Sequence, residues 1–437
     1  MMNQKVKIIG GGLAGVECAY SLSKAGIKSV ICDIKPKKFT SAHTSENLGE
    51  LVCSNSLKSN DYNANACGLL KEEMRRLGSL TMAVAEETKV PAGNALAVDR
   101  ELFSRKITEI LKNDDNVEIV CEEVEEIDLN EPTIIASGPL TTEKLIGGIA
   151  KLTGNTPYFF DAVAPIVEAG SIDFDYAFIG DRYGKGNGDY INCPLSRDEY
   201  YTFVEELIKG ETHPLHDFED KKVFEGCMAV ELMAKRGVDT LRFGMMKPVG
   251  FIDEKTGKRP FAIVQLRKEN LSGESYNIVG FQTNLKFQEQ KRIFSLIPAL
   301  KNANYLRYGK MHKNAYINAP KLLDSTFALK ENNSVYFAGQ ITGVEGYVES
   351  SASGMVAGIN MVRRILGKEK LVFPTETVIG ALSNYVTILT DNYQPMNANY
   401  AVLKPLKEEI KDKSQKKIAY ANRSLELIDK IKENIYG

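Results

Sequence analysis

The chain has 437 residues, of which 55 are Lys or Arg and 57 are Asp or Glu, so its formal charge of −2 argues neither for nor against a nucleic-acid partner. Apolar residues make up 43% and charged residues 26%, which is the composition of a globular protein and excludes disordered, collagen-like and coiled-coil chains. The length suits about two or three domains. No apolar run approaches the ~18 residues of a membrane-spanning helix, and a strand-like run close to Met1 leads us to expect no signal peptide and no membrane association.

The cysteines indicate a reducing compartment. There are seven, an odd number, scattered without a CxxC pair: Cys18, Cys32, Cys53, Cys67, Cys121, Cys193 and Cys227. We therefore expect a cytoplasmic protein with no disulfide framework, in which most thiols are buried and inert. His213 and His216 have no Cys or Glu arrangement beside them, so we expect no metal site.

The N-terminal residues have the pattern of a dinucleotide-binding unit. Val6–Ile9 predicts a strand that leads into Gly10-Gly11-Gly12-Leu13-Ala14-Gly15, which satisfies GxGxxG. A helical stretch follows, and Gly26 can end it. Ser29–Cys32 predicts a second strand, and Asp33 at its end is placed to bind a ribose hydroxyl. Strand, turn, helix, strand and acid in this order predict dinucleotide binding rather than a chance glycine-rich turn.

Each glycine of the motif has a physical reason. Gly10 allows the tight turn, Gly12 lets the backbone approach a pyrophosphate, and Gly15 lets helix and strand pack closely. The N-terminus of the helix then offers free N–H groups to the anion.

A second strand-to-helix junction lies far downstream. Pro132–Pro139 predicts a strand that ends in a Gly-Pro turn, and Val335–Gly339 predicts another that leads into a glycine-punctuated stretch. The glycines there are Gly343, Gly346, Gly354 and Gly358. This junction would return the chain to the first sheet and turn a helix N-terminus toward a second part of the ligand, although an ordinary strand–helix loop fits the pattern equally well.

The segment between these junctions has a different pattern of predicted helices and strands. Ser196 and Glu199 form a capping box that opens an amphipathic helix, and Gly210 closes it. Phe261–Leu266 and Tyr276–Phe281 predict strands. We therefore predict an α/β protein with a Rossmann-like domain into which an α+β domain is inserted. The predicted parts are 1–150 for the first part of the Rossmann-like domain, 151–330 for the inserted domain, and 331–437 for the second part with a Lys-rich C-terminal helix.

Two thiols have unusual neighbours. Cys227 precedes a predicted helix, Met228–Lys235, and a helix N-terminus favours a thiolate. Cys53 lies in a polar run about ten residues from His43, whose imidazole could activate it. Both thiols could equally be small buried residues, and His43 could be structural.

Basic and aromatic residues interleave in two runs, Arg182–Gly186 and Tyr305–His312. Such runs suit RNA, because bases stack on rings and phosphates meet Lys and Arg, but they also suit solvated loops. A Lys cluster near the C-terminus suits a solvated helix face: Lys411, Lys413, Lys416 and Lys417. From the residues alone, the chain is a flavin- or nicotinamide-binding enzyme with an inserted domain and one or two candidate thiols.

Five strings resemble a known family. They are Glu50–Ser59 (ELVCSNSLKS), Val90–Arg100 (VPAGNALAVDR), Phe224–Gly250 (FEGCMAVELMAKRGVDTLRFGMMKPVG), Tyr336–Gly354 (YFAGQITGVEGYVESSASG) and Gln394–Tyr400 (QPMNANY). By these strings the chain resembles the folate- and FAD-dependent RNA (uracil-5-)-methyltransferases, in the family's order and across nearly the whole chain. Departures are small: His43-Thr44-Ser45-Glu46 stands where the family often has a second His and an Asp, and Met245 stands where Pro is usual.

The resemblance implies a glutathione-reductase-like fold that binds FAD at the Gly10–Gly15 turn. In the family, 5,10-methylenetetrahydrofolate gives a one-carbon unit to uracil C5 through N5 of the flavin, and reduced flavin or NAD(P)H supplies the reducing equivalents. The implied cofactor-binding residues are Gly10, Gly12, Gly15, Asp33, Arg100, Gly339, Gln340, Gly343 and Gly346.

The resemblance also implies roles for the two thiols. A Cys227 thiolate that adds to uracil C6 would raise the electron density at C5, so we expect Cys227 to be the nucleophile. Cys53 would act as base, proton relay or cover for the reactive adduct. His312 would stack on the pterin, and Glu345 would hydrogen-bond it.

The implied substrate is RNA, most often the T-loop uridine of tRNA, and that base must flip out to react. Some family members methylate 23S ribosomal RNA, and no string here separates the two. Other hypotheses are an FAD oxidoreductase acting on a small molecule, the related wobble-uridine modifying flavoprotein, against which the short tail argues, and a non-catalytic RNA-binding flavoprotein. Binding RNA with a net charge of −2 would require the basic residues to be segregated on one face. The oligomeric state and the choice between NADH and NADPH stay open.

Overall fold

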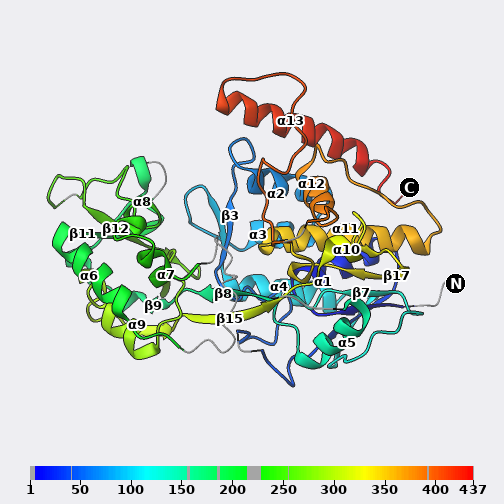
Figure 1. Ribbon diagram of the computed structural model, residues 1–437, viewed down its shortest axis with the longest axis horizontal. Helices are drawn as coiled ribbons and strands as arrows, with labels where there is room; N and C mark the ends of the chain where they lie inside the picture. Colours follow the sequence, from blue (N-terminus) through cyan, green and yellow to red (C-terminus); the bar gives the residue numbers. More distant parts are fainter. Residues whose placement is uncertain are drawn as a thin grey trace.

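The computed structural model describes residues 5–40, 42–154, 158–184, 188–213, 228–253, 255–390 and 393–436. Two bodies lie side by side (Figure 1). The larger body contains the first sheet and both ends of the chain, and the smaller body contains the second sheet. Strands β8, Tyr158–Val163, and β15, Lys310–Ala315, pair antiparallel and connect the two bodies.

A six-stranded sheet of order β16-β17-β7-β1-β2-β6 forms the centre of the larger body. Its strands are β1 Val6–Ile9, β2 Ser29–Asp33, β6 Val117–Cys121, β7 Thr133–Ile135, β16 Ala328–Leu329 and β17 Asn332–Phe337. Neighbouring strands run parallel except for β16 and β17. The central strand β1 buries Val6, Ile8 and Ile9, as a strand covered on both faces requires.

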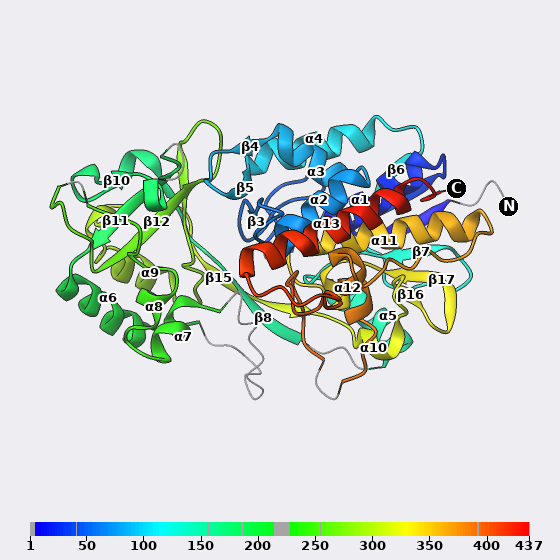
Figure 2. The same ribbon diagram turned by 90° about the horizontal axis from the view of Figure 1, so that it is seen from above.

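Helices pack around this sheet. They are α1 Leu13–Lys24, α2 Ala66–Arg76, α3 Leu80–Glu87, α4 Arg100–Lys112, α5 Glu143–Thr153, α10 Ala319–Leu322, α11 Tyr347–Ile365, α12 Val378–Tyr385 and α13 Lys413–Lys432. The C-terminal helix α13 packs on α2 and crosses the outside of the larger body (Figure 2). It buries Leu425 and Ile428, so the predicted C-terminal helix is present and packs through one face.

The close packing of α1 on α11 depends on glycine. A Cβ at Gly354 would overlap the backbone of Ala14, and one at Gly358 would lie 3.0 Å from Cα of Cys18. The thiol of Cys18 donates to the carbonyl oxygen of Gly354 at 3.1 Å, and burial raises its pKa. Cys18 is therefore one of the inert thiols that the sequence predicts.

The smaller body is built on an antiparallel sheet of order β10-β11-β12-β13-β9-β14. Its strands are β9 Ile166–Glu168, β10 Phe178–Ile179, β11 Tyr190–Leu195, β12 Ala262–Lys268, β13 Ser275–Ile278 and β14 Tyr305–Arg307. Its helices are α6 Arg197–Lys209, α7 Val230–Lys235, α8 Thr240–Phe243 and α9 Phe287–Phe294. A third, three-stranded sheet of the chain joins β3 Ser56–Ser59, β5 Ala95–Val98 and β4 Lys89–Val90.

The predicted fold class is confirmed: a Rossmann-like parallel sheet accompanies a separate α+β body. The capping box of Ser196 and Glu199 is present, and α6 ends at Gly210. One helix differs from its prediction, because α7 begins at Val230 and not at Met228. Ala229 before it has extended backbone, and the N–H of Val230 donates to the carbonyl oxygen of Gln282 at 2.7 Å.

Candidate functional site

A cavity opens at the carboxyl edge of the parallel strands of the larger body. It is lined mainly by the turn after β1, the end of β2, the segment after β7 and the start of α11: Gly10, Gly11, Gly12, Leu13, Ala14, Asp33, Ile34, Lys35, Ser137, Gly138, Pro139, Gly339, Gln340, Tyr347 and Ser350. Open α/β sheets bind their ligands at this edge, because loops from several strands converge there.

The three motif glycines differ in their surroundings. Gly10 has a φ of +108°, and a Cβ there would lie 2.6 Å from the carbonyl oxygen of Ala136. A Cβ at Gly15 would overlap the carbonyl oxygen of Gly10, so β1 and α1 could not pack. A Cβ at Gly12 would meet no atom of the described chain within 4 Å, and Gly12 lines the cavity. Gly10 and Gly15 therefore shape the turn, and Gly12 leaves its backbone open to a ligand.

Asp33 ends β2 and turns its carboxylate toward the motif. Oδ2 accepts the N–H of Gly11 at 2.8 Å, and Oδ1 accepts the N–H of Lys35 at 2.9 Å. The parallel register places Cys32 opposite Ile9, so Asp33 lies level with the turn that follows β1. The acid and the glycine turn thus face the same cavity, as the sequence predicts.

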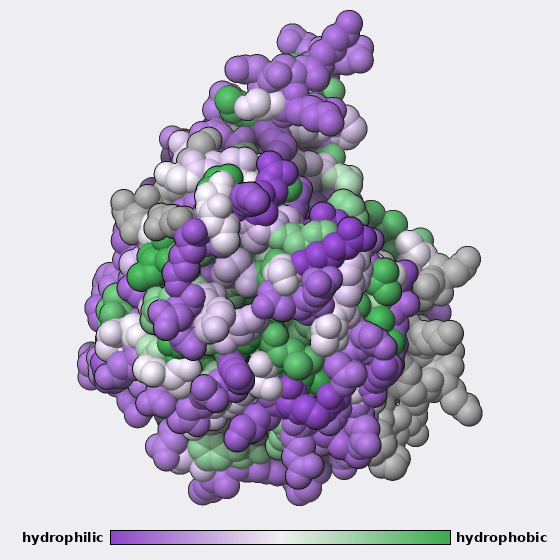
Figure 3. All heavy atoms as spheres, turned by 90° about the vertical axis from the view of Figure 1, so that its left-hand side faces the viewer, coloured by the Kyte–Doolittle hydropathy of each residue, from purple (hydrophilic) through white to green (hydrophobic). Residues whose placement is uncertain are grey.

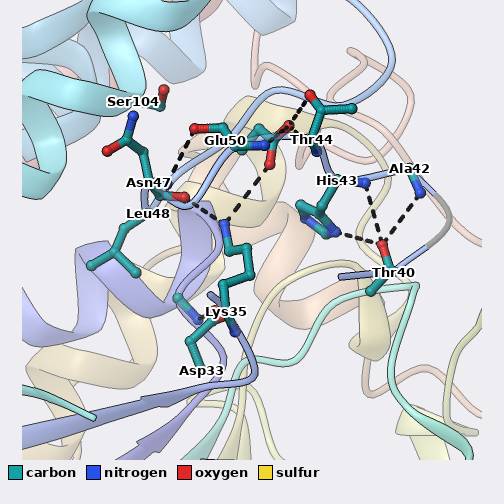
Figure 4. Close-up of polar contacts among 12 residues, drawn as sticks. Asp33, Lys35, Thr40, Ala42, His43, Thr44, Asn47, Leu48, Glu50 and Ser104 are labelled. Atoms are coloured by element: carbon teal, nitrogen blue, oxygen red, sulfur yellow. Dashed lines mark hydrogen bonds and ion pairs between the residues drawn. The ribbon is translucent and has the colours of Figure 1, made fainter. Parts of the chain in front are cut away.

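A buried charge pair lies beside Asp33 (Figure 4). Nζ of Lys35 is 3.8 Å from Oε2 of Glu50 and donates to the carbonyl oxygen of Asn47. Oε1 of Glu50 accepts the N–H of Thr44 at 2.8 Å and its hydroxyl at 3.0 Å. Both charged side chains are only 5% exposed, and Oε2 of Glu50 accepts no hydrogen bond from the residues that the structure describes. Both residues line the cavity, so this oxygen is available to a ligand hydroxyl.

His43 belongs to the same cluster. Its Nδ1 lies 2.6 Å from Oγ1 of Thr40, and its ring lines the cavity. Burial, and next the ammonium group of Lys35, lower the pKa of His43. The imidazole is therefore neutral at pH 7 and acts here as a wall and a hydrogen-bonding group.

The second strand-to-helix junction supplies the opposite wall. Gly339 follows β17 with a φ of +83°, and its N–H donates to Oγ of Ser353 at 2.7 Å. Gln340 lines the cavity, and its Nε2 donates to Oε2 of Glu345 at 2.5 Å. Glu345 is buried, so its carboxylate fixes the direction of the Gln340 amide.

Gly343 and Gly346 stand outside the cavity lining. Their φ angles are +88° and +119°, which favour glycine. A Cβ at Gly343 would overlap the ring of Tyr393, whose hydroxyl donates to the carbonyl oxygen of Thr342 at 2.8 Å. These glycines let the loop before α11 turn, and the string Gln394–Tyr400 begins next to the tyrosine that braces it.

Cys53 lies beside the cavity, on a loop that also contacts the smaller body. Its neighbour Val52 lines the cavity, and its own Sγ is 2.9 Å from the hydroxyl oxygen of Tyr347, which also lines it. The N–H groups of Cys53 and Ser54 donate to the same hydroxyl oxygen at 2.7 and 3.2 Å.

Arg100, the first residue of α4, lies outside the cavity lining. Its Nη2 donates to Oε2 of Glu269 at 2.7 Å, and its side chain is 14% exposed. Glu269 directly follows β12, so this ion pair joins the two bodies. Burial alone would lower the pKa of Arg100, but the carboxylate of Glu269, together with smaller effects of Tyr347 and Cys53, outweighs burial, and the pKa is raised.

Two predicted site residues, Cys227 and His312, are not fully described by the structure. Cys227 lies outside the described residues, which resume at Met228. The first described helix after it, α7, begins at Val230, and the predicted role of Cys227 stays a prediction. His312 lies on β15 opposite Asp161, and nothing is described of its side chain.

The two basic and aromatic runs are used differently. In Tyr305–His312, Arg307 points inward to the carbonyl oxygen of Val52, and the rings of Tyr305 and Tyr308 stack at 5.2 Å. In the other run, Tyr183 is 63% exposed. The smaller body also exposes Phe243 by 75%, and Figure 3, which views that end of the molecule, shows hydrophobic patches among hydrophilic ones.

Sequence reasoning missed several residues of the site: Lys35, Glu50, Arg267, Arg307 and Tyr347. Glu50 and Tyr347 stand inside two of the quoted strings, but the strings alone indicate no role for either residue. Arg307 stands in a run predicted to face solvent or RNA. No pattern marks Lys35, because its pairing with Glu50 depends on how the loop between them folds. None marks Arg267 either, because its partners Ser54 and Asn55 come from a distant part of the chain.

Among the described residues, no group of three or more His, Cys, Asp or Glu could hold a metal ion. No helix in the described part of the chain is long and apolar enough to span a membrane.

Comparisons with known proteins indicate the same family that the five strings resemble. A family model described as glucose inhibited division protein A matches residues 5–369. The methylenetetrahydrofolate–tRNA-(uracil-5-)-methyltransferase TrmFO of Acetivibrio thermocellus is 53% identical over 425 residues, which is 97% of each chain. The protein of the same name from Bacillus subtilis is 51% identical over 437 residues, which is the whole of both chains.

Solved structures agree on the fold. GidA of Aquifex aeolicus in one crystal form superposes with a TM-score of 0.73 and 15% identity, covering 99% of this chain and 76% of that one. A second crystal form gives a TM-score of 0.72, 16% identity and coverage of 99% and 73%. At this identity the likeness shows the fold alone.

Proposed function

Because this chain belongs to the family of methylenetetrahydrofolate–tRNA-(uracil-5-)-methyltransferases, we propose that it methylates uracil C5 in tRNA, with 5,10-methylenetetrahydrofolate as donor and FAD as bound cofactor. The observation that carries this proposal is the 51% identity over the full length of the Bacillus subtilis protein. The cavity at the carboxyl edge of the sheet supports it, because its walls have the chemistry that a dinucleotide needs.

The cavity fits FAD on three observations. The backbone of Gly12 is open on its Cβ side, Asp33 faces the turn, and Oε2 of Glu50 is buried without a donor from the described chain. The turn and the acid would hold the nucleotide half, and Gly339 and Gln340 would hold the other part. When bound, FAD would carry the one-carbon unit and electrons between folate and uracil.

Several predicted contacts enter as proposals. Gly10, Gly15, Gly343 and Gly346 shape the two loops that would touch the cofactor. Arg100 lies outside the lining, where its ion pair with Glu269 joins the two bodies, and its predicted cofactor contact stays a prediction. Glu345, through Gln340, and His312 are proposed to face the folate.

We propose different roles for Cys227 and Cys53 in the reaction at the uracil ring. The Cys227 thiolate would add to C6, so that an S–C6 bond forms and the electrons of the C5–C6 double bond move to the O4 enolate and C5. The transferred carbon arrives at the methylene level, so one hydride equivalent must also be supplied to it. Loss of the C5 proton to a base and expulsion of the Cys227 thiolate restore the C5–C6 double bond, which leaves a methyl group on C5. Cys53, at the cavity, is proposed as that base, a proton relay or a cover for the reactive centre.

The RNA would approach from the side of the smaller body, which carries the chain on from Cys227 into α7. Its exposed Tyr183 and Phe243 stand among basic residues and suit unstacked bases. We propose the T-loop uridine of tRNA as the target, NAD(P)H as the source of electrons and the cytoplasm as the compartment. The same chemistry on 23S ribosomal RNA is the alternative.

The proposed function is tested by incubating the FAD-loaded protein with unmodified tRNA, labelled methylenetetrahydrofolate and NADPH. We expect label in 5-methyluridine of the tRNA. Absence of label from tRNA and ribosomal RNA alike would refute the proposal, and turnover of NADPH without RNA would favour a small-molecule oxidoreductase.

A matched pair of variants tests the nucleophile. Cys227→Ala should abolish methyl transfer while the protein keeps its flavin. Cys121→Ala should leave transfer unchanged, because Cys121 lies on the edge strand β6 outside the cavity lining, where its thiol donates to the carbonyl oxygen of Ile34. Retained transfer in Cys227→Ala would remove Cys227 from its role.

A further inference from the structure

The hydroxyl of Tyr347 has one proton to give and two neighbours that already donate to it. The N–H groups of Cys53 and Ser54 donate to its oxygen at 2.7 and 3.2 Å, and these bonds occupy its two lone pairs. The Sγ atom of Cys53 lies 2.9 Å from the same oxygen. The phenol proton therefore points at the sulfur, and Cys53 accepts this hydrogen bond.

Tyr347 is suited to keep that proton. Burial, and next the charge of Cys53, raise the pKa of Tyr347 well above its ordinary value. The phenol thus stays protonated over the range in which thiols titrate, and it remains a donor to the sulfur.

A guanidinium group adds positive charge beside the thiol. Arg307, the last residue of β14, donates to the carbonyl oxygen of Val52. Burial, and next the like charge of Arg100, lower the pKa of Arg307. A negative charge on Cys53 favours the charged form of Arg307, and Glu269, the nearby carboxylate, is paired with Arg100.

The loop that carries the thiol is fixed from the smaller body. Arg267 on β12 donates from Nε to Oδ1 of Asn55 at 3.1 Å and from Nη2 to Oγ of Ser54 at 2.8 Å. Nδ2 of Asn55 in turn donates to the carbonyl oxygen of Lys268 at 2.8 Å. Arg267 is buried, so these bonds hold loop 52–55 in one position against α11.

We propose that Tyr347 and Arg307 are positioning residues that hold the Cys53 sulfur as a hydrogen-bond acceptor with anionic character. The inference deepens the proposed function, because it concerns the second of the two proposed thiols. A hydrogen bond donated to the sulfur stabilises the thiolate more than the thiol, so it favours the form that takes up a proton or bonds to carbon.

The test is the pH profile of Cys53 alkylation in the FAD-loaded protein, without RNA or folate. Iodoacetamide is reacted from about pH 6 to about pH 9, and the Cys53 peptide is quantified by mass spectrometry. Tyr347→Phe should move the pH of half-maximal reaction upward by about one unit, which is about a tenfold loss of rate near neutral pH. The position of the midpoint decides, because a change of access alone alters the rate but leaves the midpoint.

A second pair of variants separates charge from structure. Arg307→Met should shift the midpoint of Cys53 alkylation upward. Arg307→Lys, which keeps the charge, should have a midpoint close to that of the wild type. Tyr385→Phe is the matched control, because the Tyr385 hydroxyl donates to the carbonyl oxygen of Gln394 and its loss should leave the profile unchanged.

An unshifted midpoint in both Tyr347→Phe and Arg307→Met would overturn the proposal, and if Tyr347→Phe does not fold, the Arg307 pair decides alone. The assay contains no substrate. A protein that shows the predicted profile but does not methylate RNA would therefore contradict the proposed function and leave this inference standing.

Discussion

Gly12 differs from Gly10 and Gly15 in what a methyl group would meet. At Gly15 a Cβ would overlap the carbonyl oxygen of Gly10, and at Gly12 it would project into open space. One motif therefore contains a glycine that the fold needs and another that a ligand needs. The sequence pattern alone cannot tell these two needs apart.

Replacement by Ala should separate them. Gly12→Ala should keep the melting temperature of the FAD-free protein and lose bound flavin, because the new methyl group occupies the cavity. Gly15→Ala should destabilise the fold by about 2–4 kcal/mol, because β1 and α1 must move apart. Flavin absorbance of the purified proteins and thermal melts measure both effects, and a Gly12→Ala protein with full flavin content would contradict the ligand role of Gly12.

At this scale the motif residues could be predicted, because Gly10–Gly15 and Asp33 follow one another along the chain. Lys35 and Glu50 could not, because their pairing needs the loop between them to fold back over the cavity. The donor role of Tyr347 could not be predicted either, since it depends on N–H groups of residues almost 300 positions away, 294 for Cys53.

Helix α2 is tied to α12 and α13 by one buried carboxylate. Glu73 on α2 accepts the N–H of Val378 at 2.7 Å and that of Ile379 at 2.8 Å, at the N-terminus of α12. It also accepts the hydroxyl of Ser424 on α13 at 2.5 Å. Burial raises the pKa of Glu73 to about 7, against the opposing effect of these hydrogen bonds.

This elevated pKa predicts how stability depends on pH. The folded protein holds the Glu73 proton more tightly than the unfolded chain, so stability from Glu73 is fully present below about pH 4.5 and is lost as the pH rises through about 7. Glu73→Gln mimics the protonated acid and should lack this loss. Between about pH 5 and about pH 8 the free energy of unfolding of the variant should rise relative to that of the wild type by on the order of 3 kcal/mol. If the melting temperatures of the variant and the wild type changed in the same way with pH across that range, the elevated pKa of Glu73 would be contradicted.

Elements were predictable where their signals are local. The capping box of α6 and its end at Gly210 depend on residues within one turn, and both are present. The start of α7 was predicted two residues too early, because the N–H of Val230 is satisfied by Gln282, a partner that the local sequence does not show.

At the scale of the whole molecule, the two bodies meet around the Cys53 loop. Asn55 and Arg267 lie 212 positions apart in the chain and hydrogen-bond at the junction. The parallel sheet and the inserted body could be predicted from strand patterns and strings. The junction could not, because it depends on how two separately folded bodies face each other, and a net charge of −2 says nothing about where three arginines gather.

The central claim is that this chain makes 5-methyluridine in the T-loop of tRNA. The most direct measurement is mass mapping of 5-methyluridine in tRNA and ribosomal RNA from cells with and without the gene. The account predicts that the T-loop modification of tRNA disappears with the gene and returns with the wild-type chain but not with Cys227→Ala. T-loop 5-methyluridine that persists without the gene, with loss confined to ribosomal RNA or no loss at all, would contradict it.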